Sequence, residues 1–157
     1  MRVGIIGKTN RKEVFEITDE VCKWLEERKV ETFVEEEIGS KTLSRTKLPE
    51  YSDVVLVFGG DGTFLDVARL VCKNDIPILG VNLGGLGFLT EVTIDELYLV
   101  LDKIIKGKYK TEKREMLSAT IHRNSKVISS YFVLNDVVIN KGAMARIIDL
   151  AIYIDGS

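Results

Sequence analysis

The chain has 157 residues, which is enough for one domain with a sizeable core and part of a second. Its 22 Lys and Arg residues against 24 Asp and Glu residues give a net charge of -2, without the basic excess of proteins that bind nucleic acid or anionic membranes. Charged residues make up 29% and hydrophobic residues 45%, which is typical of globular proteins. The sequence shows no membrane-span pattern and no signal-peptide core. We therefore expect a cytoplasmic protein with no nucleic-acid or membrane partner.

The N-terminal part alternates strand patterns with an amphipathic helix pattern. A short apolar run predicts a strand over 3–6, and apolar residues at three- and four-residue spacing predict a helix over 10–29. A second strand is expected over 30–34. The polar stretch from Glu35 to Pro49 has no periodicity, so we expect a long surface loop there. Its acidic run Glu35-Glu36-Glu37 is interpreted as solvated.

The alternation continues through the next fifty residues. The apolar run from Asp53 to Phe58 is typical of a parallel strand buried on both faces. A helix pattern begins at Phe64, a strand is expected over 76–81, and a helix that opens with a capping box is expected over 93–106. Strands that alternate with helices form crossover units. We therefore predict, over residues 1–106, an α/β nucleotide-binding domain built on a Rossmann-like parallel sheet with flanking helices.

The remaining residues have the pattern of a β protein. Two strands, 117–121 and 127–134, flank a polar turn and predict a hairpin. Period-two alternation over 148–154 predicts a half-buried strand, which leads into the turn signal Asp155-Gly156. We interpret residues 107–157 as the first strands of a β-rich second domain that the sequence leaves incomplete.

Seven of the thirteen glycines lie between Gly59 and Gly87. The first group, Gly59-Gly60-Asp61-Gly62-Thr63, stands where a buried strand passes into a helix. Glycine there lets a ligand approach the backbone, and the unpaired N–H groups at a helix start can cradle a phosphate. The second group extends from Gly84 to Gly87. The alternative interpretation of both groups is that the glycines only make tight turns.

Asp61 distinguishes the first glycine group from other phosphate-binding loops, because neither a Walker A loop nor a GxGxxG fingerprint is present. A carboxylate beside a polyphosphate is costly unless it handles a metal ion or accepts a proton. We interpret Asp61 as a general base for a hydroxyl that attacks a γ-phosphoryl group. The alternative is an Asx turn, in which Asp61 bonds its own backbone.

A few other residues are weaker candidates for chemistry. Cys22 and Cys72 lie far apart without a C-x-x-C pattern, so we expect two small buried side chains on helices, with no structural zinc site and no disulfide framework. The single histidine, His122, is expected to be exposed. Lys8, Thr9 and Asn10 either border a nucleotide or start the first helix. Phe88 either lines a base pocket or packs in the core.

The glycine segments resemble those of known kinases. Residues 59–63 resemble the signature shared by NAD kinases, diacylglycerol and sphingosine kinases and, with Ser for Thr, phosphofructokinases. Residues 80–90 resemble the second glycine-rich segment of NAD kinases, and Leu134-Asn135-Asp136-Val137-Val138 resembles their Asn-Glu motif. Residues 141–146 are similar to that family too. These segments occur in family order along the chain.

The resemblance implies an enzyme that transfers the γ-phosphoryl group of ATP, or of polyphosphate in some members, to the 2′-hydroxyl of the adenosine ribose of NAD, giving NADP. It implies Asp61 as the proton acceptor, a divalent cation such as Mg²⁺, and a homo-oligomer at full length. The matching positions for NAD are Gly62, Asn135, Asp136 and Arg146, and those of the phosphate-binding turn are Gly59, Gly60 and Thr63.

Two departures and two alternatives accompany this resemblance. Position 136 is Asp where many members carry Glu, so its carboxylate reaches less far. The sequence also ends before the family's second conserved glycine- and threonine-rich segment. The alternative functions are a lipid kinase of the same superfamily and a non-catalytic nucleotide-binding fragment. Asn135-Asp136 and the segment 86–90 favour NAD kinase over the lipid kinase.

Overall fold

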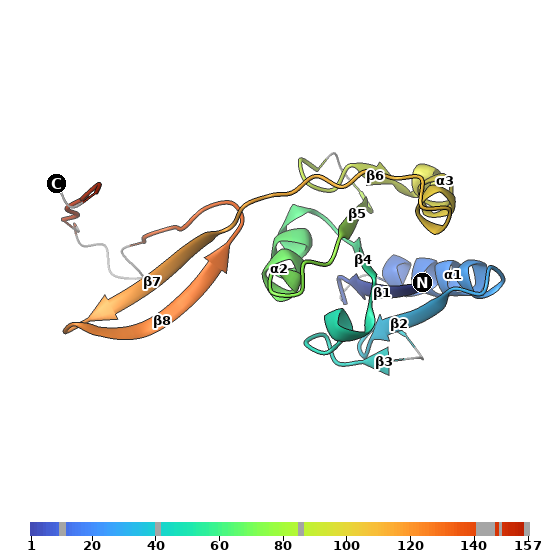
Figure 1. The fold of residues 1–157 in the computed structure, drawn as a ribbon, viewed down its shortest axis with the longest axis horizontal. Coiled ribbons are helices and arrows are strands. Elements are labelled where there is room, and N and C mark those ends of the chain that lie inside the picture. Colours follow the sequence, from blue (N-terminus) through green and yellow to red (C-terminus); the bar gives the residue numbers. More distant parts are fainter. Residues whose placement is uncertain (10–11, 40–41, 85–86, 141–146, 148, 156–157) are drawn as a thin grey trace.

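The computed structural model describes residues 1–9, 12–39, 42–84, 87–140, 147 and 149–155. Six strands form one sheet in the order β3-β2-β1-β4-β5-β6, and two more form a separate sheet, as Figure 1 shows. The elements are β1 (Arg2–Gly7), α1 (Lys12–Glu26), β2 (Glu31–Glu35), β3 (Thr42–Leu43), a 3₁₀ helix η1 (Leu48–Tyr51), β4 (Val54–Phe58), α2 (Asp61–Val71), β5 (Ile78–Asn82), β6 (Val92–Thr93), α3 (Ile94–Ile105), β7 (Leu117–Arg123) and β8 (Lys126–Val133).

All neighbouring strands of the large sheet are parallel, which confirms the predicted α/β class. The strand order is that of a Rossmann-type sheet. From β1 the chain adds β2 and β3 on one side, and it then adds β4, β5 and β6 on the other, so the strand order reverses between β1 and β4. Both strands are buried almost throughout, because helices cover both faces of the sheet.

Two apolar clusters define the faces of the sheet. On one face, α1 and α3 pack against alternate residues of the central strands, including Ile5, Leu56 and Phe58. On the other face, α2 and η1 pack against Ile6 and the intervening residues of β4. The result is a three-layer arrangement. Because successive side chains of a strand point to opposite faces, each central strand contributes residues to both apolar clusters.

The predicted surface loop over 35–49 is partly wrong. It contains β3, which extends the parallel sheet beyond β2, and it runs into η1. Ile38 is 1% exposed and Leu48 is 0% exposed. Ile38 packs into the apolar cluster on one face of the sheet and Leu48 into the cluster on the other face. They hold the segment against the sheet, although they show no helical or strand period.

The prediction of a solvated acidic run is wrong for Glu35, which is only 3% exposed. Its carboxylate accepts hydrogen bonds from the Gly7 backbone N–H at 3.3 Å and from Arg45 Nη1 at 3.2 Å. Burial raises the pKa of Glu35 above its usual range, and the Arg45 charge opposes this shift only in part. Glu35 thus joins the end of β1 to the segment that follows β2, whereas Glu36 and Glu37 are exposed as predicted.

The raised pKa of Glu35 predicts a pH-dependent stability. The native state binds this proton more tightly than the unfolded state, so the stability contributed by Glu35 is present below its usual pKa and falls as pH rises through the native pKa. We expect the stability of Glu35→Gln relative to wild type to increase between about pH 4 and 7. Urea unfolding across that range measures it, with the exposed Glu36→Gln as control. A flat or falling difference would contradict the assignment.

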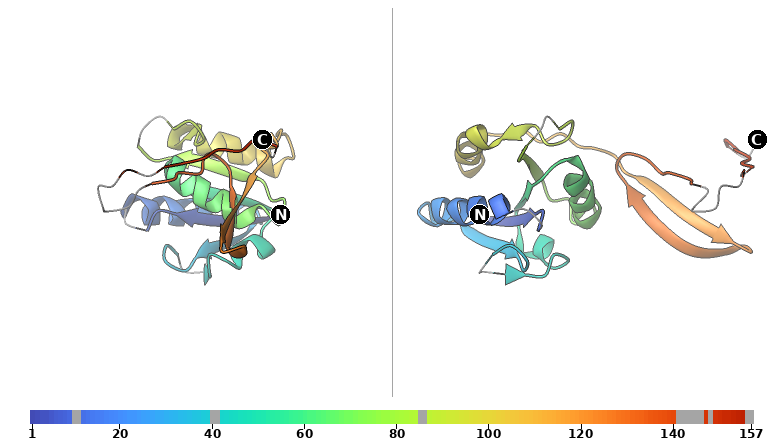
Figure 2. Two further views of the ribbon diagram at one scale, coloured as in Figure 1. Left: turned by 90° about the vertical axis from the view of Figure 1, so that its left-hand side faces the viewer. Right: turned by 180° about the vertical axis from the view of Figure 1, so that it is seen from behind.

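The C-terminal part forms the predicted hairpin, which projects away from the α/β layers in Figures 1 and 2. Its turn residues Asn124 and Ser125 have φ angles of 50° and 61°, as a type I′ turn requires. The predicted strand over 148–154 is wrong for 149–154, which form no strand, and position 148 lies outside the described residues. Alternating apolar side chains alone do not make a strand, because a strand also requires a ladder of backbone hydrogen bonds to a neighbouring strand.

The remaining local predictions are mixed. The helix predicted over 10–29 runs from Lys12 to Glu26, with Asn10 outside the described residues. The capping box of α3 is confirmed, because the Glu96 carboxylate accepts a hydrogen bond from the Thr93 backbone N–H and the Thr93 side chain accepts one from the Glu96 backbone N–H. Both cysteines are half-buried rather than buried, and His122 is exposed as expected. Across the described ranges, no helix has the length and apolar content to span a bilayer.

Thr18 is the one buried side chain in the described part of the chain whose polar atom has no hydrogen-bond partner. It is 0% exposed on the inner face of α1. Since an unpaired buried hydroxyl is unfavourable, we expect Thr18→Val to leave the free energy of unfolding unchanged or to raise it by about 1 kcal/mol. Urea denaturation measures this. A loss of more than about 1 kcal/mol would mean that the hydroxyl has a partner, such as a buried water.

Candidate functional site

A cleft of about 480 Å³ lies at the carboxyl ends of β1, β4 and β5. This is the point at which the strand order reverses, where open α/β sheets bind their ligands. The N-terminus of α2 borders the cleft, with Gly60 as its N-cap. The lining residues are Lys8, Gly59, Gly60, Gly62, Thr63, Asp66, Asn82, Leu83 and Gly84.

The structure brings together the four predicted phosphate-turn and NAD-contact residues Gly59, Gly60, Gly62 and Thr63. Gly59 is required by the fold, because a Cβ there would lie 2.6 Å from Thr63 Oγ1. Gly60 and Gly62 are different. A Cβ on either would meet nothing within 4 Å, and neither has a positive φ.

The tight-turn interpretation therefore does not explain Gly60 and Gly62. Without side chains, their backbone N–H groups at the start of α2 are open to the cleft, where the helix also places its positive dipole end. Lys8, which follows β1, brings a positive charge to the same cleft. These features together suit an anionic ligand such as a phosphate group.

Gly62→Ala separates the demands of the fold from those of a ligand. Because space is open around Gly62 inside α2, we expect this variant to be more stable by about 0.5–1 kcal/mol. We expect its affinity for ATP or NAD to fall about tenfold, since the methyl group enters the cleft. Thermal unfolding and calorimetric titration measure the two effects.

Gly107→Ala is the matched control, because Gly107 has a φ of +66° that alanine adopts only with strain. That variant should lose stability and keep its affinity. Unchanged ligand affinity in Gly62→Ala would mean that the glycine does not serve binding.

Asp61 is the first residue of α2 and is not among the residues that line the cleft. Oδ2 accepts a hydrogen bond from the Phe88 backbone N–H at 2.9 Å. Oδ1 accepts hydrogen bonds from the Leu89 N–H at 3.0 Å and from the Thr90 N–H and hydroxyl, each at 3.2 Å. The partners lie 27 to 29 residues away, so the Asx-turn alternative is wrong.

These hydrogen bonds lower the pKa of Asp61, with the Phe88 and Leu89 backbone bonds as the largest causes and the Thr90 bonds adding to them. The carboxylate is therefore charged at neutral pH. It is oriented by the turn 88–90, and the general-base role stays a prediction.

Close packing around Thr90, which is 1% exposed, explains Gly80 and Gly87, whereas Gly85 lies outside the described residues. A Cβ on Gly80 would lie 2.8 Å from Thr90 Cγ2, and one on Gly87 would lie 2.7 Å from Asp61 Oδ1 and also clash with Thr90 Oγ1. Asn82 Nδ2 donates to the Thr90 carbonyl at 3.5 Å. At these positions glycine serves the approach of two backbone segments.

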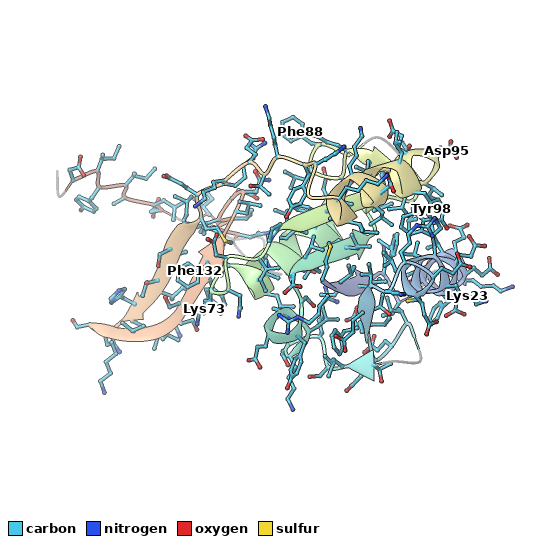
Figure 3. All side chains as sticks on the ribbon, turned by 45° about the vertical axis from the view of Figure 1, so that its right-hand side comes forward. Lys23, Lys73, Phe88, Asp95, Tyr98 and Phe132 are labelled. Atoms are coloured by element: carbon cyan, nitrogen blue, oxygen red, sulfur yellow. The ribbon has the colours of Figure 1, made fainter. Side chains whose placement is uncertain are left out.

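The other predicted site residues lie elsewhere. Asn135 and Asp136 follow β8, are exposed and do not line the cleft, although β8 itself contacts α2. Arg146 lies outside the described residues. Phe88 is 84% exposed and points away from the molecule in Figure 3, so the core-packing alternative is wrong for this side chain.

Sequence reasoning gave no role in the cleft to Asp66, Asn82 and Leu83, which line it together with Gly84 of the second glycine group. Asn82 and Leu83 stand at the end of β5, and a polar residue directly after a buried strand is the signal that could have found them. Asp66 lies one turn into α2, on the same side as Gly62 and Thr63.

The fold and the cleft define this chain as an α/β protein of the kind that binds nucleotides at the switch point of a parallel sheet. Residues 3–109 match the ATP-NAD kinase N-terminal domain. The NAD kinase of Syntrophotalea carbinolica is 45% identical over 160 residues, which cover 98% of this chain and 56% of that protein. The NAD kinase of Geotalea daltonii is 46% identical, with 99% and 56% covered. The chain belongs to the NAD kinase family, as its glycine segments indicated.

A solved structure gives the same fold. Yeast NADH kinase, crystallised in complex with NADH, superposes with a TM-score of 0.75 at 21% identity, over 86% of this chain and 47% of that one. This chain thus spans about half the length of the relatives that it matches.

Proposed function

We propose that this chain is the nucleotide-binding part of an NAD kinase, which transfers the γ-phosphoryl group of ATP to the 2′-hydroxyl of the adenosine ribose of NAD. The observation that carries the proposal is the cleft at the start of α2. There Gly60 and Gly62 leave their backbone N–H groups open, although the fold does not require glycine at either position. Membership of the NAD kinase family supports the same substrate pair.

The residues around the N-terminus of α2 would have two roles in this reaction. The turn 59–63 and Lys8 would hold the phosphates and compensate their charge in the transition state. Asp61 would accept the proton of the 2′-hydroxyl while the 2′-oxygen of the ribose forms its bond to the γ-phosphorus and ADP leaves. Asp61 is ionised before the reaction, as a proton acceptor requires, and its lowered pKa makes it a weak base that takes the proton only as the new bond to phosphorus forms.

The remaining NAD contacts are assigned to the C-terminal part. Asn135, Asp136 and Arg146 would hold NAD, with Asn135 and Asp136 placed directly after the strand that contacts α2. This division supports an α/β nucleotide-binding domain over 1–106 and the first strands of an NAD-binding domain over 107–157. We further propose a homo-oligomer at full length, as the family resemblance implies, and a cytoplasmic location, as the sequence patterns predict.

Mg²⁺ fits this site as an ion carried mainly by the nucleotide. The described residues contain no group of three or more His, Cys, Asp or Glu side chains that could hold a metal. Mg²⁺ often binds through one or two carboxylates together with substrate phosphates. Asp66 lines the cleft and offers one such carboxylate, and the bound ion would supply charge compensation on the phosphates.

Asp61→Asn in the full-length protein tests the proposal. With ATP and Mg²⁺ as donor, wild type should form NADP from NAD and should not phosphorylate diacylglycerol. We expect the variant to lose about 100-fold or more in kcat, because the amide accepts no proton. Coupled detection of NADP measures the rate, and a melting curve checks that the variant folds. Wild-type activity on the lipid alone, or an unchanged kcat in the variant, would contradict it.

A further inference from the structure

We propose that Thr90 is a positioning residue that fixes the orientation of the Asp61 carboxylate for phosphoryl transfer. Thr90 Oγ1 donates to Asp61 Oδ1 at 3.2 Å, beside the backbone N–H of the same residue. It is the one side chain among the four donors to this carboxylate, since the others are backbone N–H groups of 88–90. The inference rests on the function proposed above.

The surroundings of Thr90 restrict what this position can hold. The residue is 1% exposed, and its side chain occupies the space that a Cβ on Gly80 or Gly87 would need. The Thr90 carbonyl is further held by Asn82 from β5. Thr90 is thus fixed on both sides, and its hydroxyl has a defined direction toward Asp61.

The arrangement links a group of the proposed chemistry to a residue that does not line the cleft. Asp61 begins α2, whose N-terminal glycines line the cleft, whereas Thr90 is not a lining residue. Loss of the hydroxyl removes one of three donors from Oδ1 and frees the carboxylate to change its orientation. The orientation of a proton acceptor affects the chemical step more than ground-state binding. We therefore expect an effect on kcat and little effect on KM.

Two substitutions at position 90 separate positioning from simple packing. Val has nearly the shape of Thr without its hydroxyl, and Ser retains the hydroxyl without the methyl group. In the full-length protein, Thr90→Val should lower kcat about tenfold or more, with KM for NAD and ATP within about threefold of wild type. Thr90→Ser should recover most of kcat although it loses packing.

Thr18→Val is the matched control, because it makes the same atomic change at a buried threonine whose hydroxyl has no partner. It should keep wild-type kcat and KM. Wild-type kcat in Thr90→Val would overturn the proposal. Equal loss of kcat in Thr90→Val and Thr90→Ser would also overturn it, because the effect would then follow packing rather than the hydroxyl.

The carboxyl ¹³C NMR shift of Asp61 keeps this proposal distinguishable from the proposed function. The Asp61 carboxyl signal should shift in Thr90→Val, which lacks the hydroxyl donor, and should stay close to wild type in Thr90→Ser and Thr18→Val. If wild type forms no NADP but this shift appears, the hydrogen bond exists and the proposed function fails, and the catalytic meaning of Thr90 fails with it. If wild type is active and the shift does not appear, the positioning role alone is overturned.

Discussion

The site depends on one carboxylate, that of Asp61, which joins the start of α2 to the turn after β5. Its two oxygens accept three backbone hydrogen bonds and one hydroxyl bond from 88–90. The approach of these two segments requires glycine at positions 80 and 87 and a buried Thr90. The same contact holds in place the helix start that borders the cleft. A charged group at this point therefore serves the architecture before any chemistry is assigned to it.

The sheet explains why this contact forms beside a cleft. Parallel strands bring their carboxyl ends to one edge, and the reversal of strand order between β1 and β4 separates the connections that follow them. Gly60 and Gly62 then leave backbone N–H groups open at that edge. At the same edge, the buried Glu35 ties Gly7 to the segment after β2. The carboxyl edge of the parallel sheet thus positions both the cleft and the contacts that stabilise the fold around it.

The sequence predicts the parts of this structure that depend on local periodicity. The apolar run 54–58, the capping box of α3 and the hairpin turn are each confirmed, because their signals come from neighbouring residues. The partners of Asp61 and the burial of Glu35 were not predictable, since both depend on contacts between distant segments. The alternation over 148–154 predicts a strand wrongly, because pairing requires a neighbour that the pattern does not reveal.

The most direct test is the location of bound nucleotide, measured as backbone amide shift changes in the full-length protein titrated with ATP and Mg²⁺ and then with NAD. We predict that ATP causes its largest changes at Lys8, at 59–63 and at 82–84, and that NAD adds changes at Asn135 and Asp136. Changes confined to another surface, with these residues unaffected at saturation, would contradict this prediction.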